Sequence, residues 1–144
     1  MLIFEDYCTG PGHERRDLKY AQDMTDDIRR NIDLLLPRVN LLLTVMAADG
    51  VPIEIDPATG SPSHSGWRPP EVNAATPNAA TRSKHMDGLA DDLYDPEGAL
   101  DDWCMNHQAR LADIGLWLEH PASTKGWCHV QCVPPKSGNR VFYP

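Results

Sequence analysis

Apolar residues recur at spacings of three and four between Thr25 and Gly50, which is the pattern of one face of an amphipathic helix. Thr25 supplies a cap, and the two aspartates after it place negative charge in the first turn, where the helix dipole favours it. Pro37 lies inside this stretch, so we expect it to kink the helix or to divide it in two. We predict a core helix that carries no chemistry. Its apolar positions are Ile28, Ile32, Leu35, Leu36, Val39, Leu42, Leu43 and Met46.

A second helical stripe runs from Leu100 to Ile114 and ends at Gly115. It follows the sequence Asp-Pro-Glu at positions 95–97, which is typical of a helix start because it offers a cap, a proline in the first turn and an acid behind it. His107 lies within the stripe. We therefore interpret it as a helix-packing histidine and not as a metal ligand.

Short runs of alternating or strand-forming residues predict a small sheet. In the run 89–94, alternation places Ala90, Asp92 and Tyr94 on one face and Asp91 on the other. These elements together predict an α+β fold, in which a small and mostly antiparallel sheet has two main helices packed against one side. The expected strands are residues 51–56, 89–94, 116–121, 127–132 and 140–143.

A chain of 144 residues fits one domain. Residues 1–24 are polar and lack periodicity, so we expect an N-terminal arm that packs over the domain or lies loose, followed by a single domain at 25–144. The formal net charge of −8 argues against nucleic-acid binding, which needs a basic surface. The four cysteines form no CxxC pair and are expected to be buried, reduced thiols.

The chain also lacks a recognisable export or membrane signal. Met1 is followed closely by Glu5 and Asp6, so there is no basic region leading into an apolar core. The long apolar run near residues 34–48 is interrupted at residues 37–40, and we expect that it does not span a bilayer. We therefore expect a protein that stays in the cytoplasm as made and binds no membrane. We also expect it to be a monomer.

Candidate chemistry is concentrated in two stretches. Residues 83–92 have the form S-x-H-x-x-G-x-A-x-D, which supplies the imidazole of His85 and the carboxylate of Asp92, and the later sequence Trp-Cys-His ends at His129. Two histidines and one carboxylate, with the fourth position left to water, are the ligand set of a catalytic zinc site. Gly88 permits a tight turn between the first two ligands. Ser83 either orients this loop, touches substrate or only forms the turn.

These motifs resemble those of the M15 zinc peptidases. Residues 83–92 fit the signature of that family, Ser65–Pro70 resembles its S-G-[YW]-R-x-P segment, and residues 129–131 resemble its closing H-V-x strand. The family includes D-Ala-D-Ala carboxypeptidases, dipeptidases and bacteriophage endolysins that cut peptidoglycan stem peptides. The resemblance covers roughly residues 25–144. It implies one zinc ion held by His85, Asp92 and His129, and a substrate-binding role for Arg68, whose guanidinium suits a carboxylate or a carbonyl.

The catalytic base is where the sequence departs from that family. Many M15 enzymes carry a Glu or Asp three residues before the last histidine ligand, but here position 126 is glycine and position 124 is threonine. Glu119 is the nearest acid upstream, and we expect its strand to lie beside that of His129. We therefore assign Glu119 as the base that accepts a proton from metal-activated water, with His120 as the alternative.

The ligand set predicts a zinc hydrolase, and the resemblance implies a metallopeptidase that hydrolyses peptidoglycan stem peptides, in the manner of a carboxypeptidase or an endopeptidase. The absence of an export signal fits a phage endolysin that acts on the cell wall after release. Two alternatives stay open. One is a zinc-binding structural or interaction domain of the same fold that has lost catalysis. The other is a cytoplasmic dipeptidase that acts on free D-Ala-D-Ala.

Overall fold

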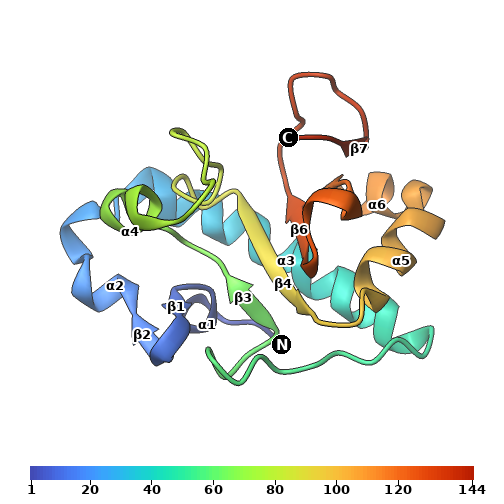
Figure 1. Ribbon diagram of the computed structural model, residues 1–144, viewed down its shortest axis with the longest axis horizontal. Helices are drawn as coiled ribbons and strands as arrows, with labels where there is room; N and C mark the ends of the chain where they lie inside the picture. The colour runs from blue at the N-terminus through green and yellow to red at the C-terminus, as the bar shows by residue number, and fades with distance from the viewer.

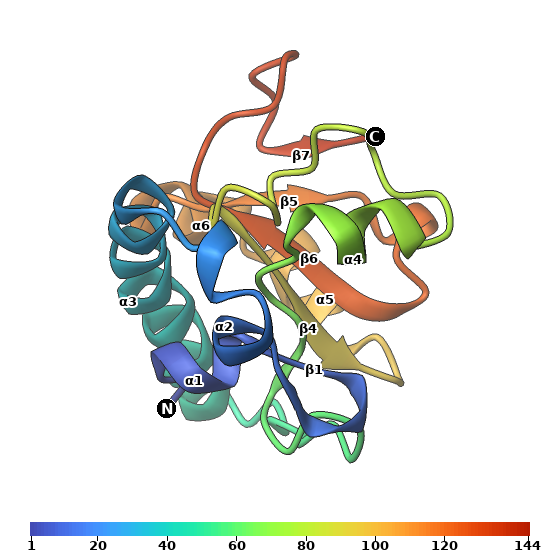
Figure 2. The same cartoon turned by 90° about the vertical axis from the view of Figure 1, so that its left-hand side faces the viewer.

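A long helix, α3, lies against one face of a five-stranded sheet in the computed structural model, which describes residues 1–144 (Figures 1 and 2). The strand order is β3-β4-β6-β5-β7, and every neighbouring pair is antiparallel except β5–β7. This confirms the predicted α+β class with a small, mostly antiparallel sheet. The strands are β3 (Ser63–Ser65), β4 (Ala90–Asp95), β5 (Trp117–Glu119), β6 (Gly126–Gln131) and β7 (Val141–Phe142).

Helix α3 (Asp26–Ala48) forms where the apolar spacing predicts it. The Thr25 hydroxyl accepts a hydrogen bond from the Ile28 amide at 3.2 Å, which caps the first turn. Pro37 lies inside one continuous helix and does not divide it, because the buried residues on both sides hold the helix against the core. These buried residues are Ile32, Leu35, Leu36, Val39, Leu42, Leu43 and Met46.

The second helical stripe is broken into α5 (Ala99–Asn106) and α6 (Gln108–Ile114). His107 separates them with φ −134° and ψ 43°, and its ring stacks on Trp103 at a centroid distance of 4.3 Å. This confirms the packing role expected for His107. The carboxylate of Asp95 accepts hydrogen bonds from the amides of Leu100 and Asp101 in the first turn of α5. Asp95 thus caps the helix as expected, although it lies four residues before the first helical residue.

The strand predicted at residues 51–56 is wrong, because this segment has no ladder partner and runs as an irregular connection. Val51 and Ile53 pack on the core. The alternation of apolar and polar residues therefore reflects this packing and not a strand. Asp56 instead closes a turn through a 2.8 Å hydrogen bond from the Ala58 amide. The edge strand β3 forms further along the chain, at Ser63–Ser65, in a polar segment that gave no strand signal.

The first 24 residues pack on the domain and share its core. Leu2, Tyr7, Cys8 and Tyr20 are buried in the same apolar cluster as α3. The Tyr7 hydroxyl donates a 2.7 Å hydrogen bond to the Ala90 carbonyl on β4. The segment therefore fixes the first residue of β4. It forms α1 (Phe4–Tyr7), β1 (Thr9–Gly10), β2 (Glu14–Arg15) and α2 (Arg16–Lys19), with short 3-10 turns at Pro11–His13 and Ala21–Asp23.

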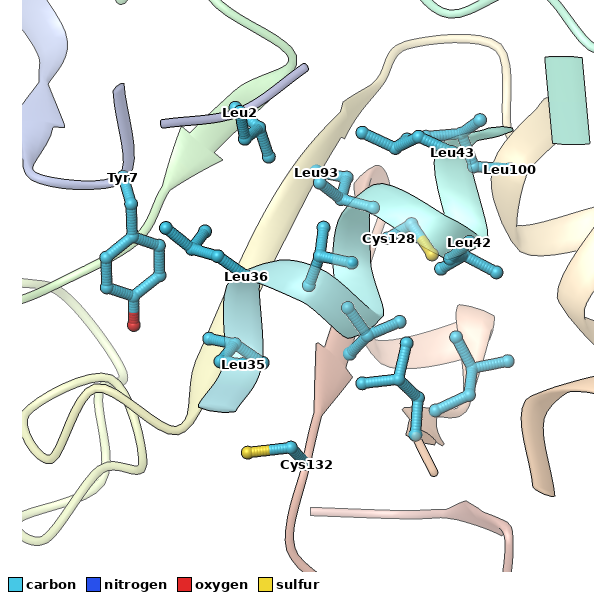
Figure 3. Close-up of a cluster of buried hydrophobic side chains, with 14 of the residues drawn as sticks. Leu2, Tyr7, Leu35, Leu36, Leu42, Leu43, Leu93, Leu100, Cys128 and Cys132 are labelled. Carbon is cyan, nitrogen blue, oxygen red and sulfur yellow. The ribbon is translucent and has the colours of Figure 1, made fainter. Parts of the chain in front are cut away.

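The core lies between α3, α5, α6 and one face of the sheet, and Figure 3 shows part of it. Leu93 of β4 and Cys128 of β6 contribute to this face. All four cysteines are free and buried, as predicted. The opposite face of β4 and β6 carries Asp92, His129 and Gln131. The remaining elements are α4 (Pro70–Ala75) and a 3-10 turn at Pro121–Ser123.

Length and composition alone make α3 a candidate membrane span, although we expected the interruption at residues 37–40 to exclude this. In the present fold its apolar side is buried against the sheet. The core helix of a globular domain meets the same criterion, so the observation is weak evidence for a membrane.

Candidate metal centre

Strands β4 and β6 bring two of the predicted ligands into direct opposition. In their antiparallel register Asp92 is the partner of His129. Directly opposed residues share a face of the sheet, with their Cβ atoms about 5 Å apart. The His129 Nδ1 lies 2.8 Å from the Asp92 Oδ1. The face they share is the one turned away from the apolar core.

The third ligand comes from the turn that leads into β4. The Ser83 hydroxyl accepts a 3.2 Å hydrogen bond from the His85 amide, which supports the loop-orienting interpretation of Ser83. Gly88 closes the turn with φ +74°, and a Cβ there would lie 2.7 Å from Ile32 Cγ1 of α3. The turn needs glycine on both counts. It places His85 Nε2 3.3 Å from Asp92 Oδ1.

The ligand atoms of His85, Asp92 and His129 all lie within 4.8 Å of one another, so the cluster could hold a metal ion. His85 shows most clearly that the cluster fits one. Its Nδ1 lies 2.9 Å from the Gly66 carbonyl and donates to it, which leaves the Nε2 lone pair facing the cluster. That Nε2 is buried and has no hydrogen-bond partner. A buried polar atom without a partner is costly, and a cation would remove the cost.

Gln131 orients the second imidazole, a role that sequence reasoning missed. Its side-chain NH₂ donates to the Val133 carbonyl at 2.8 Å, which turns its Oε1 toward His129 Nε2 at 3.1 Å. Because an amide oxygen only accepts, His129 donates from Nε2, and its Nδ1 faces Asp92 Oδ1 in the cluster. The available signal was position, because alternation along β6 places Gln131 on the same face as His129.

The cluster concentrates negative charge on Asp92. Burial alone would raise the pKa of this carboxyl, but the nearby His85 and the hydrogen bond and charge of His129 hold the pKa far below its usual range. Burial lowers the pKa of His85. Burial also opposes protonation of His129, but the hydrogen bond and charge of Asp92 raise its pKa overall. A carboxylate that stays charged and faces two imidazoles suits a divalent cation.

A cleft of 710 Å³ opens over the cluster. Arg68 lines it, and its guanidinium lies 3.7 Å from Asp92 Oδ2. Glu119 also lines it, and burial is the main reason why its pKa is raised. The β5–β6 register pairs Leu118 with Val130, so one further step brings Glu119 level with His129. Both predicted residues thus share a cleft with the ligands.

His120, the alternative base, lies outside this cleft. Its Nδ1 accepts a 3.0 Å hydrogen bond from the Ala122 amide, and its ring stacks on Tyr143 at a centroid distance of 4.5 Å. These contacts describe a residue that caps the turn after β5. The structure therefore brings Glu119, and not His120, together with the ligands.

The cleft also contains His64, which the sequence did not single out. Its Nδ1 lies 2.7 Å from Asp56 Oδ2, and its ring stacks on Trp127. The pairing of β3 with β4 is irregular at this point, because Ser63 and Ser65 oppose consecutive residues of β4. Such a bulge turns the intervening side chain, here His64, toward the cleft. A bulge depends on the partner strand, so no local signal could have revealed it.

No protein-family model, curated protein or solved structure matches the chain. The chain is therefore not assigned to a family by these comparisons.

Proposed function

We propose that this protein is a zinc-dependent peptidase that hydrolyses peptide bonds in peptidoglycan stem peptides, including one next to a D-amino acid. The observation that carries the proposal is the convergence of His85, Asp92 and His129 at the base of a cleft. His85 Nε2 is buried there without a partner. A cleft above three ligands leaves a side for water and substrate, as catalytic zinc sites require.

Zinc suits the donor set because imidazole nitrogen and carboxylate oxygen are its usual ligands when no thiolate is present. All four cysteines lie apart from the cluster, since none is among the grouped ligand atoms. Zinc in such a site polarises a substrate carbonyl and lowers the pKa of bound water to about 7. The protein must then supply a base and a means of holding the substrate.

Glu119 is the proposed base. Its raised pKa, caused mainly by burial, makes it a better proton acceptor than an ordinary surface carboxylate. It takes one proton from water as the carbonyl carbon is attacked. The same carboxyl returns that proton to the leaving amine as the C–N bond breaks. Glu119 is therefore ionised again at the end of the reaction. Arg68 holds the substrate by a carbonyl or carboxylate oxygen.

The choice of peptidoglycan is supported by the three motifs shared with M15 zinc peptidases. Arg68 and His85 line the cleft together with residues 129 and 131, and this supports the proposal. Residues from these three segments, which are far apart in the sequence, therefore lie around one cleft. The shared arrangement, and not any single motif, favours this substrate class.

The test is digestion of purified peptidoglycan with zinc-loaded protein, followed by mass analysis of the fragments. We expect new free termini in the stem peptide. Glu119→Gln should reduce turnover at least about 100-fold, the usual contribution of a positioned base. His120→Ala, which lies outside the cleft, should leave turnover nearly unchanged. Full activity in Glu119→Gln, with loss in His120→Ala, would reverse the assignment of the base.

A zinc-binding domain without catalysis is the second candidate, and one observation favours it. At the position where many M15 enzymes carry an acid, Gly126 has no side chain, and Thr124 is buried and bonded to Asp101. No acid from that segment reaches the cluster. Zinc content cannot distinguish the two functions, because both bind the ion. Absence of turnover on peptidoglycan and on free D-Ala-D-Ala would favour the second candidate.

A further inference from the structure

The cleft differs in charge from the rest of the molecule. The chain has 21 acidic residues and 13 lysines and arginines, with a formal net charge of −8. The cleft reverses this balance, because a metal ion would occupy Asp92 and leave Glu119 as its only other acid. An acidic protein with a basic cleft is suited to an anionic ligand. The basic residues lining the cleft are Arg16, Arg68, Arg82 and Lys84.

Arg16 is the least expected of these residues. It comes from α2 in the N-terminal segment and is only 8% exposed. Its Nη1 donates to the Trp67 carbonyl at 3.1 Å, but its Nε is buried without a partner. No carboxylate pairs with it. The nearby Glu14 is engaged by Lys19.

The local fold makes room for this guanidinium. A Cβ on Gly10 would lie 2.5 Å from both the Cζ and the Nη2 of Arg16. Gly10 has φ −100°, a conformation that other residues adopt, so the need for glycine here comes from space. The Gly10 backbone and the Trp67 carbonyl thus hold Arg16 in one position.

Arg16 and Arg68 lie next to each other. Because Arg16 binds the carbonyl of residue 67, its guanidinium sits beside the backbone of Arg68, and both side chains line the cleft. Arg68 Nε is also buried without a partner. Burial lowers the pKa of each guanidinium, and their mutual repulsion lowers that of Arg16 further. Asp92 faces Arg68 at 3.7 Å, but no carboxylate faces Arg16, so the two adjacent cations share one anionic partner and are unfavourable unless a further anion binds them.

We propose that Arg16 and Arg68 together form a carboxylate-binding subsite of the cleft, and that the substrate is a peptide with a free carboxylate near the cleaved bond. The identity of this ligand rests on the proposed peptidase function, whereas binding of a carboxylate does not. Arginine is suited to the task because its planar fork makes two parallel hydrogen bonds to a carboxylate. The N-terminal segment thereby completes the substrate pocket.

The test compares a stem-peptide mimic, diacetyl-L-Lys-D-Ala-D-Ala, with the same peptide carrying a C-terminal amide. Binding is measured by calorimetry to the zinc-loaded Glu119→Gln protein, which suppresses turnover. We expect the acid to bind about 10- to 100-fold more tightly than the amide, the range expected for hydrogen bonds to a charged group. Adding Arg16→Gln should reduce this preference to about threefold or less.

Arg15→Gln is the matched control, because Arg15 is partly exposed and pairs with Asp17 away from the subsite. It should keep the full preference for the acid. Gly10→Ala keeps both arginines but displaces the Arg16 guanidinium, and it should lose the preference as Arg16→Gln does. Circular dichroism checks that each variant is folded. Gly10→Ala decides the question if Arg16→Gln does not fold.

Equal binding of acid and amide, no binding of either, or an unchanged preference in both Arg16→Gln and Gly10→Ala would overturn the subsite. Digestion of peptidoglycan by the wild-type protein separates this failure from that of the proposed function. Cleavage without a preference for the acid overturns the subsite alone. Selective binding of the acid without any cleavage keeps the subsite and overturns the peptidase.

Discussion

Two consecutive carboxylates on β4 lie on opposite faces of the sheet, and their pKa values are shifted in opposite directions. Asp91 and Asp92 are both buried. Burial raises the pKa of Asp91 to about 7, and one hydrogen bond from the Ser63 hydroxyl offsets this only in part. Burial alone would also raise the pKa of Asp92, but the imidazoles of His85 and His129 outweigh this effect and lower the pKa.

The comparison shows that burial alone does not determine the charge of a buried acid. What decides it is the set of partners that the fold places on each face. On the cleft face, the β4–β6 register and the turn before β4 supply two imidazoles to one carboxylate. On the core face, the same strands supply Leu93, Cys128 and Val130 to the apolar cluster. The side chains of the cleft face could hold a cation, and those of the core face are buried in the apolar cluster.

The largest expected effect distinguishes the two carboxylates directly. Asp92→Asn should reduce zinc affinity by more than about 100-fold, because loss of an outer hydrogen-bond partner alone costs about 10- to 100-fold. Asp91→Asn should keep the ion, since Asp91 faces away from the cluster. Metal analysis after dialysis checks this as zinc per chain, with one expected for Asp91→Asn and nearly none for Asp92→Asn. Equal zinc content in the two variants would contradict the assignment of faces.

The next effect belongs to the core face. Leu93→Ala should lower the free energy of unfolding by about 2 to 5 kcal/mol, because Leu93 is fully buried and its truncation leaves a cavity. Zinc content should stay at one per chain. Urea unfolding with a chelator present measures stability without the contribution of metal binding. Leu34→Ala on the exposed side of α3 is the control and should change stability by about 0.5 kcal/mol or less.

The elements around these two faces differed in how well the sequence predicted them. Helix α3 was predicted because its own apolar periodicity matches the surface that it buries, and strands β4 and β6 lie where runs of strand-forming residues predicted them. The segment 51–56 alternates in the same way but finds no partner strand, and β3 pairs with β4 without any alternation of its own. Pairing across the sheet is a tertiary property, and residue order within one segment does not reveal it.

The site residues also fall into two groups, those that local motifs predicted and those that depend on tertiary contacts. The motif spacing identified His85, Asp92 and His129, and the structure brings them together. Arg16 and His64 escaped notice because they reach the cleft through segments that carry no motif. Their roles depend on contacts over long sequence separations, such as the bond from Arg16 to the Trp67 carbonyl. Local patterns do not contain that information.

Gln131 offers a smaller change on the cleft face. Gln131→Ala should weaken zinc binding about 10- to 100-fold, because His129 loses the acceptor that fixes its tautomer. Gln131→Glu keeps an acceptor and should restore most of the affinity. Competition with a zinc-binding dye measures both variants. Gln108→Ala, at an exposed position on α6, is the control, and an equal loss of affinity there would mean that the effect of Gln131→Ala is not specific.

The smallest effect concerns Asp101 of α5, which packs behind β6 on the core side. Burial raises the pKa of Asp101 to about 7. One carboxylate oxygen accepts a hydrogen bond from the Thr124 hydroxyl, and the other is buried without a partner. An acid in the unfolded chain titrates near 4. Between these two pKa values the folded protein holds a proton that the unfolded chain releases, so stability falls as the pH rises from about 4 through 7.

Asp101→Asn removes this dependence and keeps an oxygen that accepts from Thr124. Relative to wild type, the variant should therefore gain stability on going from pH 5 to pH 8, by an amount on the order of 1 to 3 kcal/mol. Urea unfolding at several pH values with a chelator present measures the difference. Because Asp91 titrates in both proteins, subtracting the two curves isolates Asp101. A difference that does not vary with pH would mean that Asp101 is ionised in the folded protein throughout this range, and that the core face tolerates a buried charge as the cleft face does.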